Sequence, residues 1–142
     1  MGKTLKAQIV EPEDIAYIWD QVVPLLEMVK EHSEGEAEPD DFLEPLTHGD
    51  MQLWVATEDK KVIAALITQI IPYPQKKILR LISLAGDEFN RFKDCLDIVE
   101  AFAINNQCTA LEMWGRKGWK RLLPDWKDSY IVYTKDIKSR MQ

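Results

Sequence analysis

The stretch MQLWVATEDKKVIAALITQI, residues 51–70, decides the fold of this chain. It begins with a segment rich in β-branched and aromatic side chains, residues 53–59, which is typical of a strand. A long and nearly continuous apolar run follows at residues 62–71, as expected for a strand that is buried on both faces of a sheet. Lys60-Lys61 stands between the two segments, and we expect the turn of a hairpin there.

The next segment adds a third strand. Residues 76–86, KKILRLISLAG, are apolar and branched, and Pro72-Tyr73-Pro74 ends the previous strand because proline cannot sit inside a central ladder. Short connections favour antiparallel neighbours, so the three segments predict a meander. Nearer the N-terminus, residues 5–10 alternate between apolar and polar side chains and suit one further strand.

Helical patterns surround the predicted strands. Over residues 15–30, apolar side chains recur every three or four positions, which predicts an amphipathic helix. Pro24 lies inside this pattern and is expected to kink or break the helix, because it lacks a backbone donor and clashes with the preceding turn. A shorter helix is expected over residues 40–46, and a longer one over residues 87–106.

The remaining segments complete the predicted sheet. Residues 109–114 suit a strand parallel to the third strand of the meander, if the crossover between them is right-handed. Residues 117–123 suit a short helix, and residues 129–137 alternate well and are expected to close the sheet. Acidic residues 32–45 are expected to form a loop or a connector between short helices. The sequence therefore predicts a single α/β (α+β) domain over residues 1–142, with an antiparallel meander joined to a parallel β-α-β crossover.

Composition excludes several classes of protein. Of the 142 residues 46% are hydrophobic, which is too apolar for a disordered chain, and 2 cysteines are too few for a disulfide scaffold. The formal net charge of -6 argues against nucleic acid or an anionic membrane as partners. The sequence contains neither an apolar run that could span a bilayer nor a recognisable signal peptide, so we expect a soluble, cytoplasmic protein.

The thiol and imidazole groups do not form a recognisable motif. Cys95 and Cys108 lack CxxC spacing, and His32 and His48 lie in a different region of the sequence. We therefore expect no metal site and no Cys–His dyad, and we expect both cysteines to be structural.

The order of the predicted elements resembles the GNAT fold of N-acetyltransferases over nearly the whole chain. More narrowly, the chain is similar to the small GNAT-like proteins of tailed phages and prophages. The resemblance implies that the fourth and fifth strands splay apart and that the pantetheine arm of acetyl-CoA lies along the exposed backbone between them. The segments that carry it are MQLWVATEDKKVIAALITQI, YPQKKILRLISLAG, ALEMWGRKGWKRLL and the closing aromatic strand.

The same resemblance implies a cofactor site at the end of the fourth strand. Leu84, Ala85 and Gly86 occupy the position where the family binds acetyl-CoA. The pyrophosphate of the coenzyme rests on a glycine-rich loop at the next helix in this family, but here Asp87 and Glu88 take the place of its glycines. Each carboxylate beside a pyrophosphate costs on the order of 1 kcal/mol, whereas at the start of a helix such acids are ordinary. The loop is therefore degenerate as a phosphate cradle.

A second basic segment follows the fifth predicted strand. In GRKGWKR, Arg116 and Lys117 could hold an anion, and the resemblance places them near the nucleotide end of the coenzyme. Alternatively, they solvate the surface of a short helix. Both interpretations stay open at the level of sequence.

Candidate catalytic residues also follow from the resemblance. GNAT enzymes use a carboxylate on a central strand to accept the proton of the amine, and a tyrosine near the last strands to protonate the leaving thiolate. Glu112 is the candidate base, and Tyr130 or Tyr133 is the candidate acid. Alternatively, Glu112 simply faces solvent.

Two functions are compatible with these patterns. One is acyl-CoA-dependent N-acyl transfer, with acetyl-CoA as cofactor and a small amine or a protein amine as acceptor. The other is a non-catalytic phage protein of the same fold, which would act as a structural component of the virion or as a binder of a host factor. Such a protein would reside in the host cytoplasm or in the virion. Whether the chain is an enzyme therefore depends on the site.

Overall fold

A mixed sheet of five strands organises the chain in a computed structural model that describes residues 5–30, 38–86, 96–113, 123–127 and 133–137. The strands lie in the order β1-β2-β3-β4-β5, and all neighbours are antiparallel except β4 and β5, which are parallel. This arrangement confirms the predicted meander and the predicted parallel crossover. The elements are β1 (Leu5–Val10), η1 (Pro12–Asp14), α1 (Ile15–Lys30), η2 (Pro39–Phe42), α2 (Leu43–Thr47), β2 (Gln52–Glu58), β3 (Lys61–Pro72), β4 (Lys77–Gly86), α4 (Leu96–Asn105) and β5 (Ala110–Met113).

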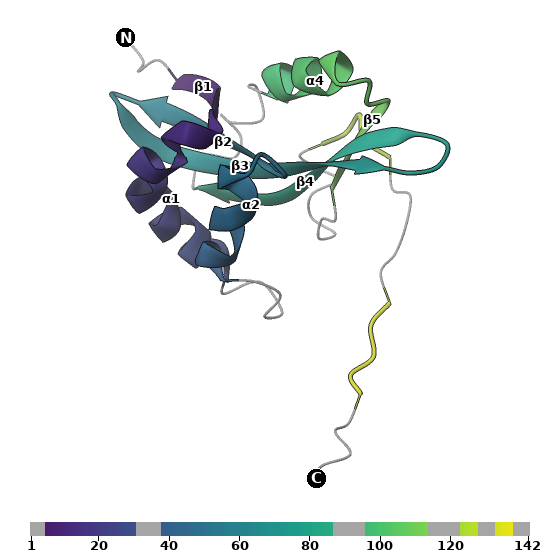
Figure 1. The fold of residues 1–142 in the computed structure, drawn as a ribbon, viewed down its shortest axis with the longest axis horizontal. Coiled ribbons are helices and arrows are strands. Elements are labelled where there is room, and N and C mark those ends of the chain that lie inside the picture. The colour runs from purple at the N-terminus through teal and green to yellow at the C-terminus, as the bar shows by residue number, and fades with distance from the viewer. Residues whose placement is uncertain (1–4, 31–37, 87–95, 114–122, 128–132, 138–142) are drawn as a thin grey trace.

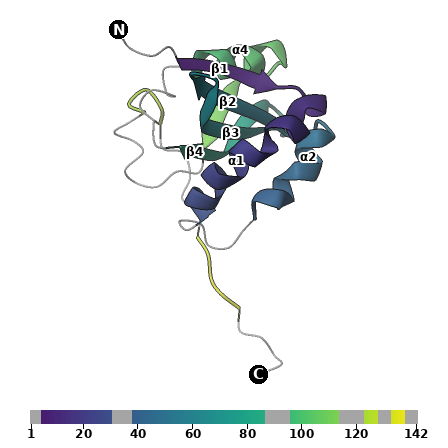
Figure 2. The same cartoon turned by 90° about the vertical axis from the view of Figure 1, so that its left-hand side faces the viewer.

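Helices cover both faces of this sheet. Helices α1 and α2 lie on one face and α4 lies on the other (Figures 1 and 2). Strand β3 supplies both cores by alternation, because successive side chains of a strand point to opposite faces. Ala65 and Ile67 are buried in the core on the α1 side, and Ala64 and Leu66 are buried in the core on the α4 side. The prediction that this apolar run is covered on both faces is confirmed.

The hairpin between β2 and β3 is shifted by one residue from the expected turn. Asp59 and Lys60 have φ angles of 53° and 67°, and Lys61 is already the first residue of β3. Two successive residues in the left-handed region form the kind of two-residue turn whose twist matches that of the flanking strands.

The expectation that Pro24 breaks the first helix is wrong. Helix α1 runs without interruption through Pro24. Pro24 lies on the exposed side of the helix, where water can satisfy the carbonyl that loses its partner. The neighbouring turns are held by Val22 and Leu26, which are 0% and 3% exposed.

Part of the acidic segment 32–45 is helical and not a loop. Residues 39–47 form η2 and α2, in agreement with the shorter helix expected over residues 40–46. Glu38 and Asp41 form a capping box at the start of η2, and the Glu38 backbone N–H donates to Asp41 Oδ2 at 2.7 Å. Residues 31–37 lie outside the described part of the chain.

The C-terminal predictions are met only in part. Helix α4 confirms residues 96–105 of the helix expected over residues 87–106, and the earlier part of that helix lies outside the described residues. The same is true of residues 117–122, and Leu123, the last residue of the expected short helix, is not helical. None of the described helices combines the length and the apolar character that crossing a bilayer requires.

The expected closing strand is absent where the structure describes it. Residues 133–137 are not in a strand and stand clear of the sheet as the last described segment before the C-terminus (Figures 1 and 2). Tyr133 and Ile137 are 88% and 93% exposed. The prediction of a closing strand over residues 129–137 is therefore wrong for residues 133–137, and residues 129–132 lie outside the described part of the chain.

Candidate functional site

Strand β4 carries an extra residue where its pairing with β5 ends. The register between β4 and β3 skips Ile82, which lies between the paired residues Leu81 and Ser83 and forms a β-bulge. Leu81 is also the last residue of β4 that pairs with β5, opposite Met113. A bulge bends its strand and increases the local twist, so it redirects the rest of β4.

Beyond the bulge, one edge of β4 has no strand partner among the residues that the structure describes. Residues 82–86 continue along β3, while the described part of β5 ends at Met113. Backbone N–H and C=O groups along such an edge can bind an extended ligand that carries amide groups, as they bind an added strand. We call residues 82–86 the β4 edge.

Three of the residues predicted to bind a cofactor lie on the β4 edge. Ala85 is 2% exposed and packs in the core on the α1 side. Leu84 packs in the core on the α4 side. Gly86 ends the strand with a φ of 131°. Because side chains 84 and 85 point into the two cores, the backbone is the part of this segment that can contact a ligand.

The other proposed cofactor groups cannot be placed. Arg116 and Lys117 lie outside the described residues, and so do Asp87 and Glu88, which occupy the expected phosphate loop. The described residues therefore include the expected pantetheine end of the site, and its expected phosphate end lies outside them.

The predicted base Glu112 forms an ion pair across the parallel strands. Its Oε1 lies 2.7 Å from Nε of Arg80, and the two side chains are 22% and 20% exposed. Arg80 is also its register partner on β4, two residues before the bulge at Ile82. A second nitrogen of Arg80 donates to the hydroxyl of Tyr73 at 2.9 Å. The alternative that Glu112 simply faces solvent is wrong, because its carboxylate is three-quarters buried and paired.

The two candidate acids are not gathered with Glu112. Tyr133 belongs to the exposed segment that stands clear of the sheet, with 88% of its surface accessible. Tyr130 lies outside the described residues. Arg80 and Tyr73, which sequence reasoning did not select, are the residues that accompany Glu112. The pairing of β4 with β5 brings Glu112 to Arg80, and the turn between β3 and β4 places Tyr73 beside Arg80. Arg80 was visible in the sequence as the one charge inside an apolar strand.

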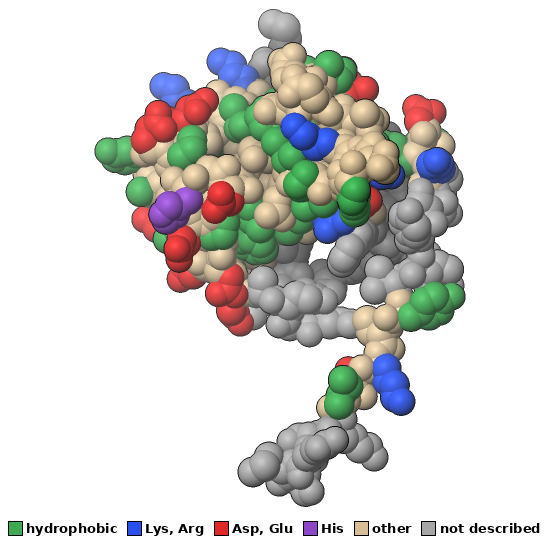
Figure 3. All heavy atoms as spheres, turned by 45° about the vertical axis from the view of Figure 1, so that its right-hand side comes forward, with side chains coloured by type: hydrophobic (Ala, Val, Ile, Leu, Met, Phe, Trp, Pro, Cys, Tyr) green, Lys and Arg blue, Asp and Glu red, His purple; other side chains and the backbone are tan. Residues whose placement is uncertain are grey.

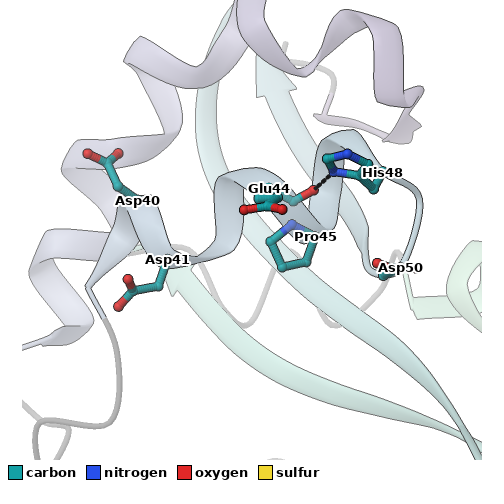
Figure 4. Close-up of a pocket in the computed structure, with 6 residues that line it drawn as sticks. All are labelled: Asp40, Asp41, Glu44, Pro45, His48 and Asp50. Carbon is teal, nitrogen blue, oxygen red and sulfur yellow. Dashed lines mark hydrogen bonds between the residues drawn. The ribbon is translucent and has the colours of Figure 1, made fainter.

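An acidic hollow lies beside α2 and was also missed. Asp40, Glu44 and His48 recur every four positions, and that spacing was the signal that could have revealed one helical face. The His48 ring Nδ1 lies 2.8 Å from the backbone oxygen of Glu44. The hollow measures about 470 Å³ and is shown in Figure 4. It is lined by Asp40, Asp41, Glu44, Pro45, His48 and Asp50.

This hollow belongs to a wider acidic surface. Acidic side chains gather around the histidine on the face shown in Figure 3. On its α1 side, Trp19 Nε1 donates to Asp40 Oδ1 at 3.1 Å and ties α1 to η2. A surface of this sign attracts cationic molecules.

Cys108 is a buried structural thiol. Burial raises the pKa of the Cys108 thiol, and the positive charge of Lys77 offsets part of this effect. A thiol with a raised pKa is a poor nucleophile at neutral pH. Cys95 lies outside the described residues. Within the described ranges, no group of three or more His, Cys, Asp or Glu side chains is placed to hold a metal ion.

Comparison of the whole structure with solved structures shows the class of fold. The chain has the GNAT fold: its neighbours are acetyltransferases of that fold, and each aligns over almost its full length. An aminoglycoside acetyltransferase from an uncultured soil metagenomic sample, in complex with sisomicin, matches with a TM-score of 0.71 and 16% identity, covering 94% of this chain and 97% of that one.

Two further neighbours have other stated activities or ligands. A ribosomal-protein-alanine N-acetyltransferase from Brucella melitensis biovar Abortus matches with a TM-score of 0.70 and 11% identity, covering 94% of this chain and 100% of that one. A predicted acetyltransferase from Clostridium acetobutylicum with acetyl-CoA matches with a TM-score of 0.68 and 13% identity, covering 94% and 96%. No family model matches the sequence, and no curated protein matches it. At these identities the likeness establishes the fold.

Proposed function

We propose that this chain is an acyl-CoA-dependent N-acyltransferase with a degenerate pyrophosphate loop. The observation that carries the proposal is the β4 edge, where the bulge at Ile82 coincides with the end of β5 pairing. The donors and acceptors of an extended backbone edge fit the two amide groups of a pantetheine arm. When bound, acetyl-CoA supplies an acyl group activated as a thioester. A solved neighbour of the same fold contains acetyl-CoA.

Glu112 is proposed as the group that accepts the proton of the acceptor amine. It stands on β5 beside Arg80, two residues before the bulge, so its carboxylate lies near the point where the β4 edge begins. Arg80 holds the carboxylate in place through Nε. Tyr130 or Tyr133 remains the proposed source of the proton for the leaving thiolate, with Tyr133 reaching the site only if its segment moves or belongs to another chain.

The acceptor is proposed to be a cationic amine. The net charge of -6 and the acidic surface beside α2 both favour the approach of a positively charged molecule. Two solved neighbours suggest probes of different size: an aminoglycoside such as sisomicin, and a peptide that begins with alanine. Arg116 and Lys117 are proposed to bind the phosphates of the coenzyme in place of the missing glycines.

Binding of acetyl-CoA is the direct test of this proposal. A ligand at a hundred times its dissociation constant adds about 2.7 kcal/mol to the free energy of unfolding. For a chain of this length, that corresponds to a rise in melting temperature of about 5–10 °C. A thermal melt with millimolar acetyl-CoA measures it, with 3′,5′-ADP and free pantetheine as controls for the two ends of the coenzyme. An unchanged melting temperature would remove the acyltransferase proposal.

Replacing Asp87 and Glu88 together by glycine should strengthen coenzyme binding. The substitution removes two carboxylates from the expected phosphate loop, each of which costs on the order of 1 kcal/mol beside a pyrophosphate. We expect the dissociation constant of acetyl-CoA, measured by calorimetry, to fall by roughly tenfold or more. Replacing Asp97 and Glu100 of α4 by alanine is the matched control for net charge, and it should leave the affinity unchanged. Equal effects in both variants would mean that only overall charge matters.

Glu112→Gln tests the proposed base. Loss of a general base lowers turnover by about 10²–10⁴-fold. We expect that loss in kcat for acyl transfer to the best amine acceptor, while the thermal shift with acetyl-CoA is retained. Arg80→Met breaks the same ion pair but keeps the carboxylate of Glu112. It should therefore lower kcat less than Glu112→Gln does, and the rate should still depend on pH. If the two variants lose activity equally, Glu112 has a structural role only.

One specific observation supports a second candidate function. Asp87 and Glu88 stand where the fold binds phosphate, which favours a non-catalytic protein that has retained the fold and lost the coenzyme. In that case the chain would serve a phage as a virion component or as a binder of a host factor. Fixed stoichiometry in purified phage particles, together with no response to acetyl-CoA, would support this candidate.

A further inference from the structure

Ser83 is the one residue of the β4 edge that has a polar side chain. The remaining residues of this edge are Ile82, Leu84, Ala85 and Gly86. The Ser83 side chain is half-buried, and its hydroxyl makes no hydrogen bond within the described part of the chain. A serine hydroxyl can both donate and accept a hydrogen bond. This hydroxyl adds nothing to the apolar packing of β4, so it is available to a ligand that lies along the β4 edge.

The bulge decides the face of the sheet on which Ser83 lies. Leu81 packs in the core on the α4 side, and strict alternation would place residue 83 on that same side. The register partner of Ser83 is instead Ile67, which is buried in the core on the α1 side. Directly paired residues of antiparallel strands share a face. The extra residue Ile82 therefore moves Ser83 from the α4 side to the α1 side.

The proposed base Glu112 lies on the same face as Ser83. Leu111 and Met113 pack against the core on the α4 side, so alternation directs the side chain of Glu112, which stands between them, to the α1 side. Pairing of β4 with β5 ends at Leu81 and Met113. Ser83 and Glu112 thus share one face of the sheet, on either side of the point where this pairing ends.

We propose that the Ser83 hydroxyl donates a hydrogen bond to the acyl carbonyl oxygen of bound acetyl-CoA, an inference that rests on the proposed function. The acyl group belongs at the Glu112 end of the β4 edge, because the base has to reach the amine that attacks the acyl carbon. Negative charge builds on the carbonyl oxygen as the C–N bond forms, and a fixed donor stabilises that charge. Glu112 takes the proton of the amine, and the sulfur leaves with the electron pair of the C–S bond. Ser83 therefore keeps its own proton throughout.

Titration calorimetry with acetyl-CoA and with free CoA isolates this contact, because CoA lacks the acyl carbonyl. Ser83→Ala should raise the dissociation constant of acetyl-CoA by about threefold to tenfold, as expected for the loss of one hydrogen bond, and leave that of CoA unchanged. Ser83→Thr keeps a hydroxyl and should retain the preference of the wild type for acetyl-CoA. Thr47→Ala removes an exposed hydroxyl from α2 and is the matched control, which should change neither constant.

The carbonyl stretch of the ligand gives an independent readout. Isotope-edited infrared spectra of acetyl-CoA, labelled at its carbonyl carbon, should show a lower frequency on the wild type than on Ser83→Ala, because a hydrogen bond weakens the C=O bond. Equal loss of affinity for acetyl-CoA and CoA, or the same frequency on both proteins, would overturn the role of Ser83 and leave acyl transfer standing. If the wild type binds neither ligand, the proposed function fails and this inference fails with it.

Discussion

Gly86→Ala is expected to lower the free energy of unfolding by about 2–4 kcal/mol, from steric overlap and backbone strain together. A Cβ at this position would lie 2.6 Å from the backbone oxygen of Ile63 and 2.9 Å from Cα of Ala64. These atoms belong to β3, at the centre of the sheet, so they cannot move aside as a flexible side chain would. Gly86 also has a φ of 131°, which side chains of L-residues rarely adopt. Urea unfolding, followed by tryptophan fluorescence, measures the loss.

Gly49→Ala is the matched control for this effect. Gly49 also has a positive φ, of 82°, but a Cβ there would meet nothing within 4 Å. Its substitution should cost only about 1 kcal/mol, which is the price of the backbone conformation alone. If Gly86→Ala and Gly49→Ala lower the free energy of unfolding equally, the close approach of β4 to β3 does not restrict the residue type at position 86.

Leu66→Ala should have an effect of similar or greater size, about 3–5 kcal/mol. Leu66 is 0% exposed on β3 and lies in the core on the α4 side. Removing its branched end forfeits the transfer energy of the lost carbon atoms and leaves a cavity that the central strand cannot collapse around. The melting temperature should fall by about 8–15 °C, as measured by calorimetry.

The control for Leu66 lies on the helix that covers the same face. Ile104 on α4 is 64% exposed, and Ile104→Ala should change stability by no more than about 0.5 kcal/mol. A small loss at Leu66 would indicate that α4 does not pack on the sheet as described. Comparison of Leu66→Ala with Ile104→Ala therefore tests whether α4 packs on the face of the sheet into which Leu84 of the β4 edge points.

The sequence predicted only those parts of the candidate site that follow from the local pattern along the chain. The periodicity of residues 76–86 located the strand that carries Leu84, Ala85 and Gly86, and the resemblance assigned them to the coenzyme. Their side chains point into the two cores, so the contact with a ligand falls to the backbone, which leaves little trace in residue type. Glu112 was selected correctly as a residue of β5, but the ion pair with Arg80 joins positions 32 residues apart and has no local signal.

By itself the sequence determined the meander of β2, β3 and β4, the parallel pairing of β4 with β5, the two-faced burial of β3 and the helical faces of α1 and α4. These features follow from alternation and from spacing of three or four, which are local properties of the chain. Only the tertiary structure decided where β4 bulges, which carboxylate pairs with Arg80, that α1 passes through Pro24, and that Tyr133–Ile137 leaves the sheet. Each of these depends on register and packing between distant segments, where one residue of shift changes every contact.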